Sequence, residues 1–330
     1  MQDTLLIDGS ESKLSRHHDH FGQVVRSYSQ LIKPKIIFLL LVTTAGGMWI
    51  PAQGHLDPKL FGFTLLGGGL AAAAANAINM IYDSDIDQVM ERTRARPIPA
   101  GRIQPRDALI FAVGLAVLSF SLLMTFANGL SACLAMVGIV VYVGVYTHWL
   151  KRSSTQNIVI GGAAGAIPPL VGWAAVTGGL SWPAWVLFAI IFLWTPPHFW
   201  ALAILKQEDY ARAGVPMLPV VEGEISTARQ IFIYTLLILP VTLLLVFPFH
   251  VMGSFYGFSA LGLGGGLIWK SWHLMQCPQD RDRAGGLFVY ANLYLLFLCL
   301  VIGVDTLPIT HQLSAHLWQM LDPLWRSGLA

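Results

Sequence analysis

Long apolar stretches alternate with short polar segments along almost the whole sequence. A helix needs about 20 apolar residues to cross a bilayer, and all its backbone groups are then paired internally. Hydrophobic residues make up 55% of the chain and charged residues only 12%, which is far from the balance of a soluble domain. The sequence therefore predicts an all-α, polytopic membrane protein with nine transmembrane helices, at about residues 36–54, 60–82, 108–128, 130–149, 157–178, 182–205, 229–250, 254–275 and 286–305.

The positive charges predict how these helices are oriented. The chain has 20 Lys and Arg residues, and in the nine-helix arrangement only Lys59 and Arg326 fall on the opposite side from all the others. Positive charge gathers on the cytoplasmic side of a membrane protein. We therefore expect a cytoplasmic N-terminus and a periplasmic C-terminus. The expected parts are a cytoplasmic polar arm (1–34), a transmembrane domain (35–305) and a periplasmic C-terminal tail (306–330).

The N-terminal segment, the cysteines and the net charge indicate in which membrane the protein lies and which kinds of partner it binds. The first 30 residues contain four acidic residues and no apolar stretch of the length that a secretory signal needs, and acids are rare in mitochondrial transit peptides. We expect a bacterial inner membrane, with the lipid bilayer as the first partner. The three cysteines are isolated, so they indicate neither a disulfide framework nor a zinc site. A net charge of +2 gives no indication of nucleic acid as a partner.

A polar stripe marks the end of the second predicted helix, in "NMIYDSDIDQVMERTRARPIPAGR" (79–102). Residues four apart share a helix face, so Asn79, Asp83 and Asp87 are expected to lie on one line. Asp85 lies about 200° around the helix from Asp83 and should face elsewhere. Carboxylates at the C-terminal end of a helix meet the negative end of its dipole, so a cation should compensate them.

Two sources of that cation are open. The neighbouring arginines could supply it, in a solvated ion network at the membrane edge. Alternatively, Mg²⁺ could bind, since it takes one or two carboxylates and completes its shell with water and substrate phosphate. Arg92 and Arg96 would then hold the same phosphate through paired hydrogen bonds. Acids and arginines together favour a metal–diphosphate site that opens towards the cytoplasm and takes a substrate with a lipid tail.

The sixth predicted helix ends in a second polar segment, "LKQEDYARAGVPMLP". Lys206, Asp209 and Tyr210 follow the i, i+3, i+4 spacing and should share a face. The alternative for Lys206 and Tyr210 is ordinary snorkelling at the interface. Both polar segments have the same layout, acids followed by Arg, Gly and Pro, which suggests an internal duplication that places the two loops over one cavity.

These residues carry a resemblance to a known family. "NMIYDSDID" fits the Asn-x-x-x-Asp-x-x-x-Asp signature of the UbiA superfamily of intramembrane prenyltransferases, and "ERTRARPIPAGRI" is similar to its continuation. Three further blocks resemble the protohaem IX farnesyltransferase branch of that superfamily: "LIKPKIIFLLLVTTAGGMW", "YTHWLKRSSTQNIVIGGAAGAIPPLVGW" and "FLWTPPHFWALAILKQEDYARAGVPMLPVVEG". The resemblance covers about residues 30–305.

The resemblance implies a reaction and a set of site residues. The farnesyl group of farnesyl diphosphate would pass to the vinyl group of haem B, with addition of water, to give haem O and diphosphate. Mg²⁺ would be the cofactor, and a haem A synthase would act downstream. Catalytic and metal-binding roles are implied for Asn79, Asp83, Asp87 and Asp209. Roles in binding the diphosphate are implied for Arg92, Arg96, Lys35, Lys151, Arg152, Lys206 and Tyr210.

Two segments inside the membrane invite further predictions. His198, in "WTPPHFWA", is a polar side chain within a span and hence a candidate haem contact. It could instead bond a backbone carbonyl freed by Pro196 or Pro197. The stretch 161–172, "GGAAGAIPPLVG", predicts close helix packing and a break in the helix at its two prolines.

Two other functions remain open at this point. Another UbiA-type prenyltransferase, with an aromatic or tetrapyrrole acceptor, would keep the aspartate signature. Members with aromatic acceptors usually have a second aspartate four residues after the position of Asp209, where this chain has Ala213. A transporter would place polar residues at the midplane of several helices, whereas here they gather at one edge.

Overall fold

The computed structural model describes residues 22–307. The predicted arm (1–34) and tail (306–330) lie largely outside this range, and the division into three parts stays a prediction. The described chain is helical and contains no strand, which confirms the all-α class. After a helix over 22–32, the elements are α2 (Pro34–Ala52), α3 (Pro58–Tyr82), α4 (Ser84–Val89), α5 (Pro105–Phe126), α6 (Gly129–Val140), η1 (Val141–Trp149), η2 (Leu150–Arg152), α7 (Asn157–Ala166), α8 (Pro168–Thr177), α9 (Trp182–Leu205), α10 (Gln207–Arg212), α11 (Leu218–Val221), α12 (Gly223–Leu243), α13 (Ser254–Gln276) and α14 (Arg281–Asp305).

Eight helical segments within residues 22–307 are long and apolar enough to cross a membrane. They match eight of the nine predicted spans. The segment predicted at 254–275 forms α13, a helix of 23 residues, but it is not among the eight. Its glycines, serines and Lys270 lower its hydropathy. The count of nine and the orientation of the termini therefore stay predictions.

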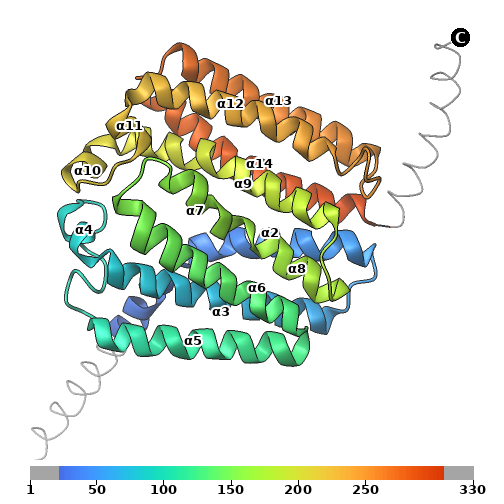
Figure 1. Cartoon of the computed structure of the whole chain (residues 1–330), viewed down its shortest axis with the longest axis horizontal. Coiled ribbons are helices and arrows are strands. Elements are labelled where there is room, and N and C mark those ends of the chain that lie inside the picture. Colours follow the sequence, from blue (N-terminus) through green and yellow to red (C-terminus); the bar gives the residue numbers. More distant parts are fainter. Residues whose placement is uncertain (1–21, 308–330) are drawn as a thin grey trace, which may run out of the picture.

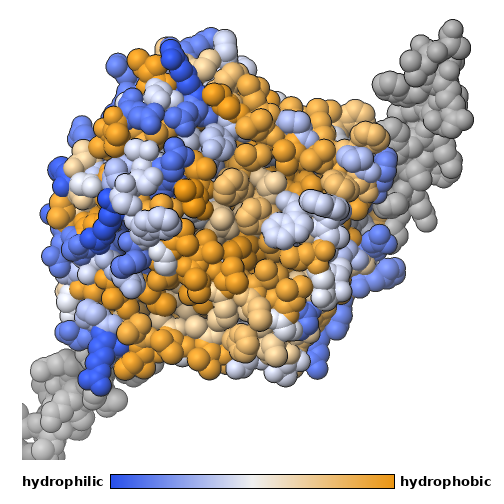
Figure 2. Space-filling model, viewed as in Figure 1, coloured by the Kyte–Doolittle hydropathy of each residue, from blue (hydrophilic) through white to orange (hydrophobic). Residues whose placement is uncertain are grey.

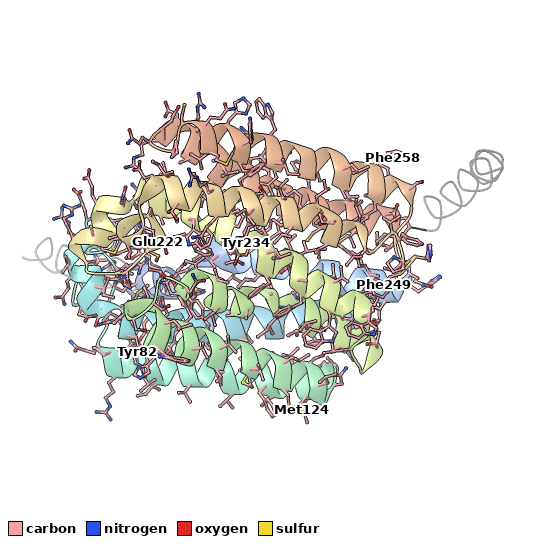
Figure 3. The ribbon with its side chains drawn as sticks, turned by 45° about the horizontal axis from the view of Figure 1, so that its top comes forward. Tyr82, Met124, Glu222, Tyr234, Phe249 and Phe258 are labelled. Carbon is pink, nitrogen blue, oxygen red and sulfur yellow. The ribbon has the colours of Figure 1, made fainter. Side chains whose placement is uncertain are left out.

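The long helices lie side by side, and the short helices α4, α10 and α11 gather at one end of the bundle (Figure 1). A space-filling view shows an apolar surface across the middle and hydrophilic residues at both ends, as expected for a protein surrounded by lipid (Figure 2). Tyr82 and Glu222 lie at the end with the short helices, whereas Met124 and Phe258 lie at the opposite end (Figure 3). The two polar loops predicted from the sequence therefore share one end of the molecule.

The Gly- and Pro-rich stretch at 161–172 breaks into two helices, α7 and α8, on either side of Ile167. Close packing holds α8 against α2. A Cβ added to Gly172 would lie 2.1 Å from the carbonyl oxygen of Thr44, and one added to Gly47 would lie 2.2 Å from that of Pro169. Both the predicted break and the predicted close packing are confirmed.

The fourth predicted helix is not uniform. It begins as α6 and continues as a π-helix, η1, before a 3₁₀ turn, η2. The hydroxyl of Thr147 donates to the carbonyl of Tyr142, five residues earlier, at 2.8 Å. Short π-helical segments inside longer helices are frequent at functional sites. Here the π-helix is followed directly by the 3₁₀ turn η2, which contains Lys151, one of the predicted site residues.

Candidate active site

The end of α3 and the start of α4 present the predicted polar stripe. Asn79 lies in the last turn of α3, Asp83 joins the two helices, and Asp87 lies in α4. All three are buried, and the Nδ2 of Asn79 donates to the Oδ2 of Asp83 at 2.8 Å. The side chain of Asp85 is 64% exposed, against 2% for that of Asp83. The prediction that Asp85 faces away from the stripe is confirmed.

Each residue of the stripe is paired with a cation of the chain. Lys151 Nζ donates to Asp83 Oδ2 at 2.5 Å. Arg96 Nη1 donates to both carboxylate oxygens of Asp87, at 2.9 and 2.7 Å. Lys33 Nζ donates to Asn79 Oδ1 at 2.8 Å. Basic side chains therefore supply the compensating charge that the sequence required, and two of them are lysines from distant segments.

Lys33 lies just before the first predicted span, a position for which the sequence alone favours a membrane-edge anchor over a residue of the site. Its side chain is partly exposed, but the ammonium group reaches inward to Asn79. Burial, and then the nearby charge of Arg96, lower the pKa of Lys33 to about 7, although Asp83 opposes this effect. Crowding of positive charge is thus a property of this site. A polyanion would relieve it.

A cavity of about 430 Å³ adjoins the stripe. Its lining contains four cations and no acid: Gln30, Lys33, Pro34, Lys35, Ile36, Arg92, Ala95 and Arg96. The side chain of Arg92 is exposed and has no ion pair within residues 22–307. The predicted diphosphate residues Lys35, Arg92 and Arg96 are thus brought together, beside Lys33. The cavity is suited to an anionic group.

The second polar segment forms the end of α9 and α10. Asp209 and Tyr210 are buried, whereas Lys206 is exposed. Asp209 accepts from Arg212 at 2.5 Å. The pKa of Tyr210 is raised, chiefly by burial. The charges of Arg92 and Arg96 oppose this effect, and those of Asp209 and Asp83 add to it. The phenol therefore lies within electrostatic reach of both polar segments, in agreement with the neighbouring positions of α4 and α10 (Figure 1).

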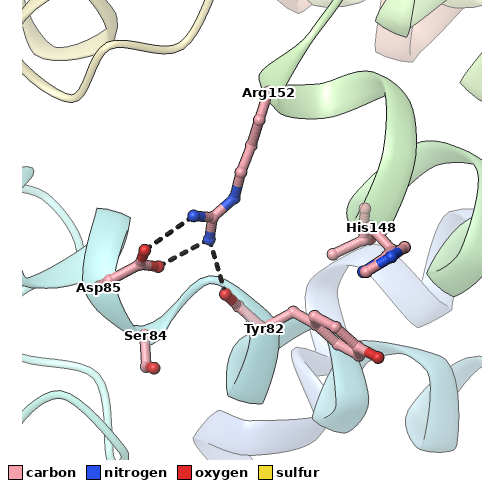
Figure 4. A pocket seen from close by; sticks show the side chains of 6 residues that line it. Tyr82, Ser84, Asp85, His148 and Arg152 are labelled. Atoms are coloured by element: carbon pink, nitrogen blue, oxygen red, sulfur yellow. Dashed lines mark hydrogen bonds and ion pairs between the residues drawn. The ribbon is translucent and has the colours of Figure 1, made fainter.

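Arg152 takes a different position from the other predicted diphosphate residues. It donates to both oxygens of Asp85 at 2.7 Å and to the carbonyl of Tyr82 at 2.8 Å (Figure 4). These groups line a separate cavity of about 390 Å³ together with Ser84, Thr147 and His148. The hydrogen bond with Arg152 lowers the pKa of Asp85 to about 2. Arg152 therefore holds the face of α4 that points away from Asp83.

His198 lies deep in α9 and is almost fully buried. Its ring stacks on Trp194 and on Phe288, with centroid distances of 4.4 and 4.7 Å. Its Nδ1 has no hydrogen-bond partner within the described chain, and no bond joins the ring to a carbonyl of the preceding turn. The alternative of a carbonyl freed by Pro196 or Pro197 is therefore wrong for this conformation. A haem contact stays a prediction.

The stripe fits Mg²⁺ better than a metal that requires a cage of protein ligands. Within residues 22–307 no group of three or more His, Cys, Asp or Glu side chains is arranged around one point. However, the Oδ1 of Asp83 is buried and has no hydrogen-bond partner there. Such an atom offers one anionic oxygen, and Mg²⁺ needs only one or two carboxylates when water and phosphate complete its shell. Asp83 and Asp87 meet that requirement.

Two further residues belong to the site although the sequence did not assign them to it. Lys33 contacts Asn79, as described above. Thr147 accepts from Asn79 Nδ2 at 3.1 Å and so joins η1 to the stripe. Asn157, at the start of α7, is fully buried, and neither of its amide atoms has a partner within the described chain. The only signal that the sequence carried for Lys33, Thr147 and Asn157 is that all three lie in the family-like blocks.

Named proteins are similar to this chain over most of its length. Residues 40–298 match the model of the UbiA prenyltransferase family. A "Protoheme IX farnesyltransferase" of Synechococcus sp. (strain JA-3-3Ab) is 69% identical over 297 residues, which cover 90% of this chain and 89% of the relative. A protein of the same name from Trichodesmium erythraeum is 62% identical over 309 residues, with 93% and 94% covered.

Solved structures share the fold. A structure described as digeranylgeranylglyceryl phosphate synthase has a TM-score of 0.71 at 20% identity, and the match covers 86% of this chain and 99% of the other. A UbiA homologue from Archaeoglobus fulgidus bound to DMAPP and Mg²⁺ has a TM-score of 0.60 at 14% identity, with 84% and 99% covered. With the family match and these relatives, the chain belongs to the UbiA prenyltransferase family and is a prenyltransferase.

Proposed function

We propose that this chain transfers the farnesyl group of farnesyl diphosphate to the vinyl group of haem B, with addition of water, and so forms haem O and diphosphate. The observation that carries the proposal is the buried Asn79–Asp83–Asp87 stripe beside a cavity lined by four cations, at the polar end of an apolar bundle. The relatives at 62–69% identity that are named protoheme IX farnesyltransferase support the acceptor.

The diphosphate end of the donor is the group that this site would hold. Asn79, Asp83, Asp87 and Asp209 would hold Mg²⁺, which when bound neutralises charge on the leaving diphosphate. Lys35, Arg92 and Arg96 line the cavity and would bind the phosphate oxygens, with Lys151 and Lys206 close to the two polar segments. Donors already in place where charge develops stabilise the departure of a leaving group.

The apolar bundle would protect the reactive carbon of the donor from water. When the bond between C1 of the farnesyl group and the diphosphate oxygen breaks, C1 becomes an allylic cation. Water must be excluded until the terminal vinyl carbon forms its bond to C1. The positive charge then resides on the vinyl carbon next to the porphyrin ring, where water adds and releases a proton. No strong general base is needed for the first step.

We also propose in which membrane the enzyme lies and which enzyme uses its product. We place it in a bacterial inner membrane with the site open towards the cytoplasm, because the segments around α4 and α10, which share one end of the bundle, are rich in arginine: Arg92, Arg94, Arg96, Arg102 and Arg212. Haem O, the product, would be the substrate of a haem A synthase downstream. The acceptor is the element that most needs a direct test.

Mass spectrometry of extracted haems provides that test. The full-length chain is expressed in bacteria that lack their own haem O synthesis, and the haems of their membranes are compared with those of cells carrying an empty vector. A haem O peak that requires the chain is the expected result. Haem B alone in both samples would contradict the proposal, and a prenylated aromatic compound in place of haem O would favour a different acceptor.

A second prediction concerns His198. Because its ring lies inside an aromatic cluster on α9, deeper in the bundle than Asp209, we expect His198→Ala to weaken haem B binding while the affinity for an unreactive farnesyl diphosphate analogue stays unchanged. Haem titration followed by absorbance, beside an analogue-binding assay, measures both. Equal loss of both ligands would indicate a purely structural role, and unchanged haem affinity in a folded variant would exclude a haem contact.

A further inference from the structure

The two carboxylates of the stripe are held in ion pairs that differ from the contacts proposed for catalysis. Asp83 is bound by Lys151 at 2.5 Å, and Asp87 by Arg96 at 2.7 Å. Yet Lys151 and Arg96 are also the residues expected to bind the diphosphate. Each cation has N–H donors to spare, but its ion pair occupies carboxylate oxygens: Oδ2 of Asp83, and both oxygens of Asp87. A metal that binds these oxygens must therefore displace the cations from them.

Burial explains why the ion pairs form. The side chains of Asp83 and Asp87 are 2% and 3% exposed, while those of Lys151 and Arg96 keep 13% and 23% of their surface in contact with solvent. A buried carboxylate without a counter-ion is strongly unfavourable. The cations therefore neutralise the stripe, and their greater exposure leaves the long side chains room to turn towards the adjoining cavity, which Arg96 already lines.

Charge balance then distinguishes free Mg²⁺ from Mg²⁺ bound to a diphosphate. Free Mg²⁺ would enter a site whose carboxylates are already neutralised and which also contains Lys33, so it would meet net repulsion. A diphosphate ester carries more negative charge than one Mg²⁺ neutralises, so their complex is anionic. That complex offers phosphate oxygens to the displaced cations and a metal to the released carboxylates.

We propose that Lys151 and Arg96 are resident counter-ions that exclude free divalent metal, and that they transfer from the carboxylates to the diphosphate when the metal–diphosphate complex binds as a unit. The Oδ1 of Asp83, which has no partner in the described chain, is the oxygen that the metal can reach before Lys151 leaves Oδ2. This inference rests on the farnesyl diphosphate site of the proposed function. It adds that the site recognises the complex of metal and diphosphate and not the free metal.

Metal retention provides a readout separate from turnover. The purified full-length chain in nanodiscs is equilibrated with Mn²⁺, alone or with the unreactive analogue farnesyl thiodiphosphate, and the metal retained on a filter is measured by mass spectrometry. We expect the native chain to retain Mn²⁺ weakly alone and at least about tenfold more tightly with the analogue. Lys151→Met and Arg96→Met should bind Mn²⁺ alone about tenfold more tightly than the native chain and bind the analogue more weakly.

Two controls separate this exchange from a general change in charge. Lys151→Arg keeps the cation and should restore weak binding of Mn²⁺ alone. Arg283→Met removes a guanidinium from the ion pair with Asp280, at the start of α14, and should leave Mn²⁺ binding unchanged. Thermal unfolding of each variant confirms that it is folded.

The possible results have distinct meanings. Tight binding of Mn²⁺ alone by the native chain would overturn the exchange and leave the proposed donor site standing. Unchanged Mn²⁺ affinity in both folded Met variants would do the same. A native chain that retains no Mn²⁺ even with the analogue would overturn both the exchange and the donor site.

Discussion

Replacement of Asp83 by Asn is expected to lower kcat/KM for farnesyl diphosphate by about 10²–10³-fold, the loss typical when a group that stabilises transition-state charge is removed. The amide has nearly the shape of the carboxylate but no negative charge for a metal, and it leaves Lys151 without a buried counter-ion. The effect should appear mainly in kcat, since charge on the leaving diphosphate develops during bond breaking.

Asp85→Asn is the matched control. It makes the same chemical change two residues away, at a side chain that is largely exposed and bound to Arg152 on the other face of α4. An exposed ion pair contributes little, so we expect the rate to change by no more than about threefold. Haem O formation by both purified variants, measured by chromatography, makes the comparison. Equal losses would show that position on the helix face does not decide function.

Gly172→Ala is expected to lower the melting temperature by roughly 2–5 °C, the result of about 1–3 kcal/mol of overpacking in a chain of this length. The new Cβ would lie 2.1 Å from the carbonyl oxygen of Thr44, which is backbone and cannot rotate away. α8 and α2 would have to separate. Because α2 begins directly after Lys33, its displacement should also disturb the contact of Lys33 with Asn79 and reduce activity.

Gly165→Ala tests whether the effect arises from this contact. It makes the same substitution in the neighbouring helix α7, at a position where an added Cβ meets no atom within 4 Å. Alanine is the better helix former, so the melting temperature should stay unchanged or rise slightly. Thermal unfolding in one detergent, followed by tryptophan fluorescence, compares the two variants. Similar melting temperatures would contradict the close contact between α8 and α2.

Much of the architecture was predictable because its causes are local. Hydropathy over about 20 residues identified the spans, and eight of them are confirmed as long apolar helices. The i, i+4 spacing placed Asn79, Asp83 and Asp87 on one buried face and excluded Asp85. The two prolines at 168 and 169 predicted the break between α7 and α8, because proline lacks the N–H that a helix interior needs.

The pairing of charges was not predictable in this way. Sequence reasoning grouped Arg152 with the diphosphate residues, but the structure pairs it with Asp85; it treated Lys33 as an anchor, but the structure directs it to Asn79. Thr147 reaches the stripe from a π-helix and Lys151 from the 3₁₀ turn that follows it, and a search for 3.6-residue periodicity detects neither.

By itself, the sequence determined that the chain forms apolar helices, that its acids and arginines meet at one membrane edge, and that one helix face carries the carboxylates. Those properties depend on hydropathy and on spacing within single helices. Only the tertiary structure decided which cation neutralises which carboxylate. The partners lie 46 residues apart for Lys33 and Asn79 and 68 for Lys151 and Asp83. Whether such side chains meet depends on how each helix is rotated against its neighbours, which contacts such as Gly172 on Thr44 settle only in the folded bundle.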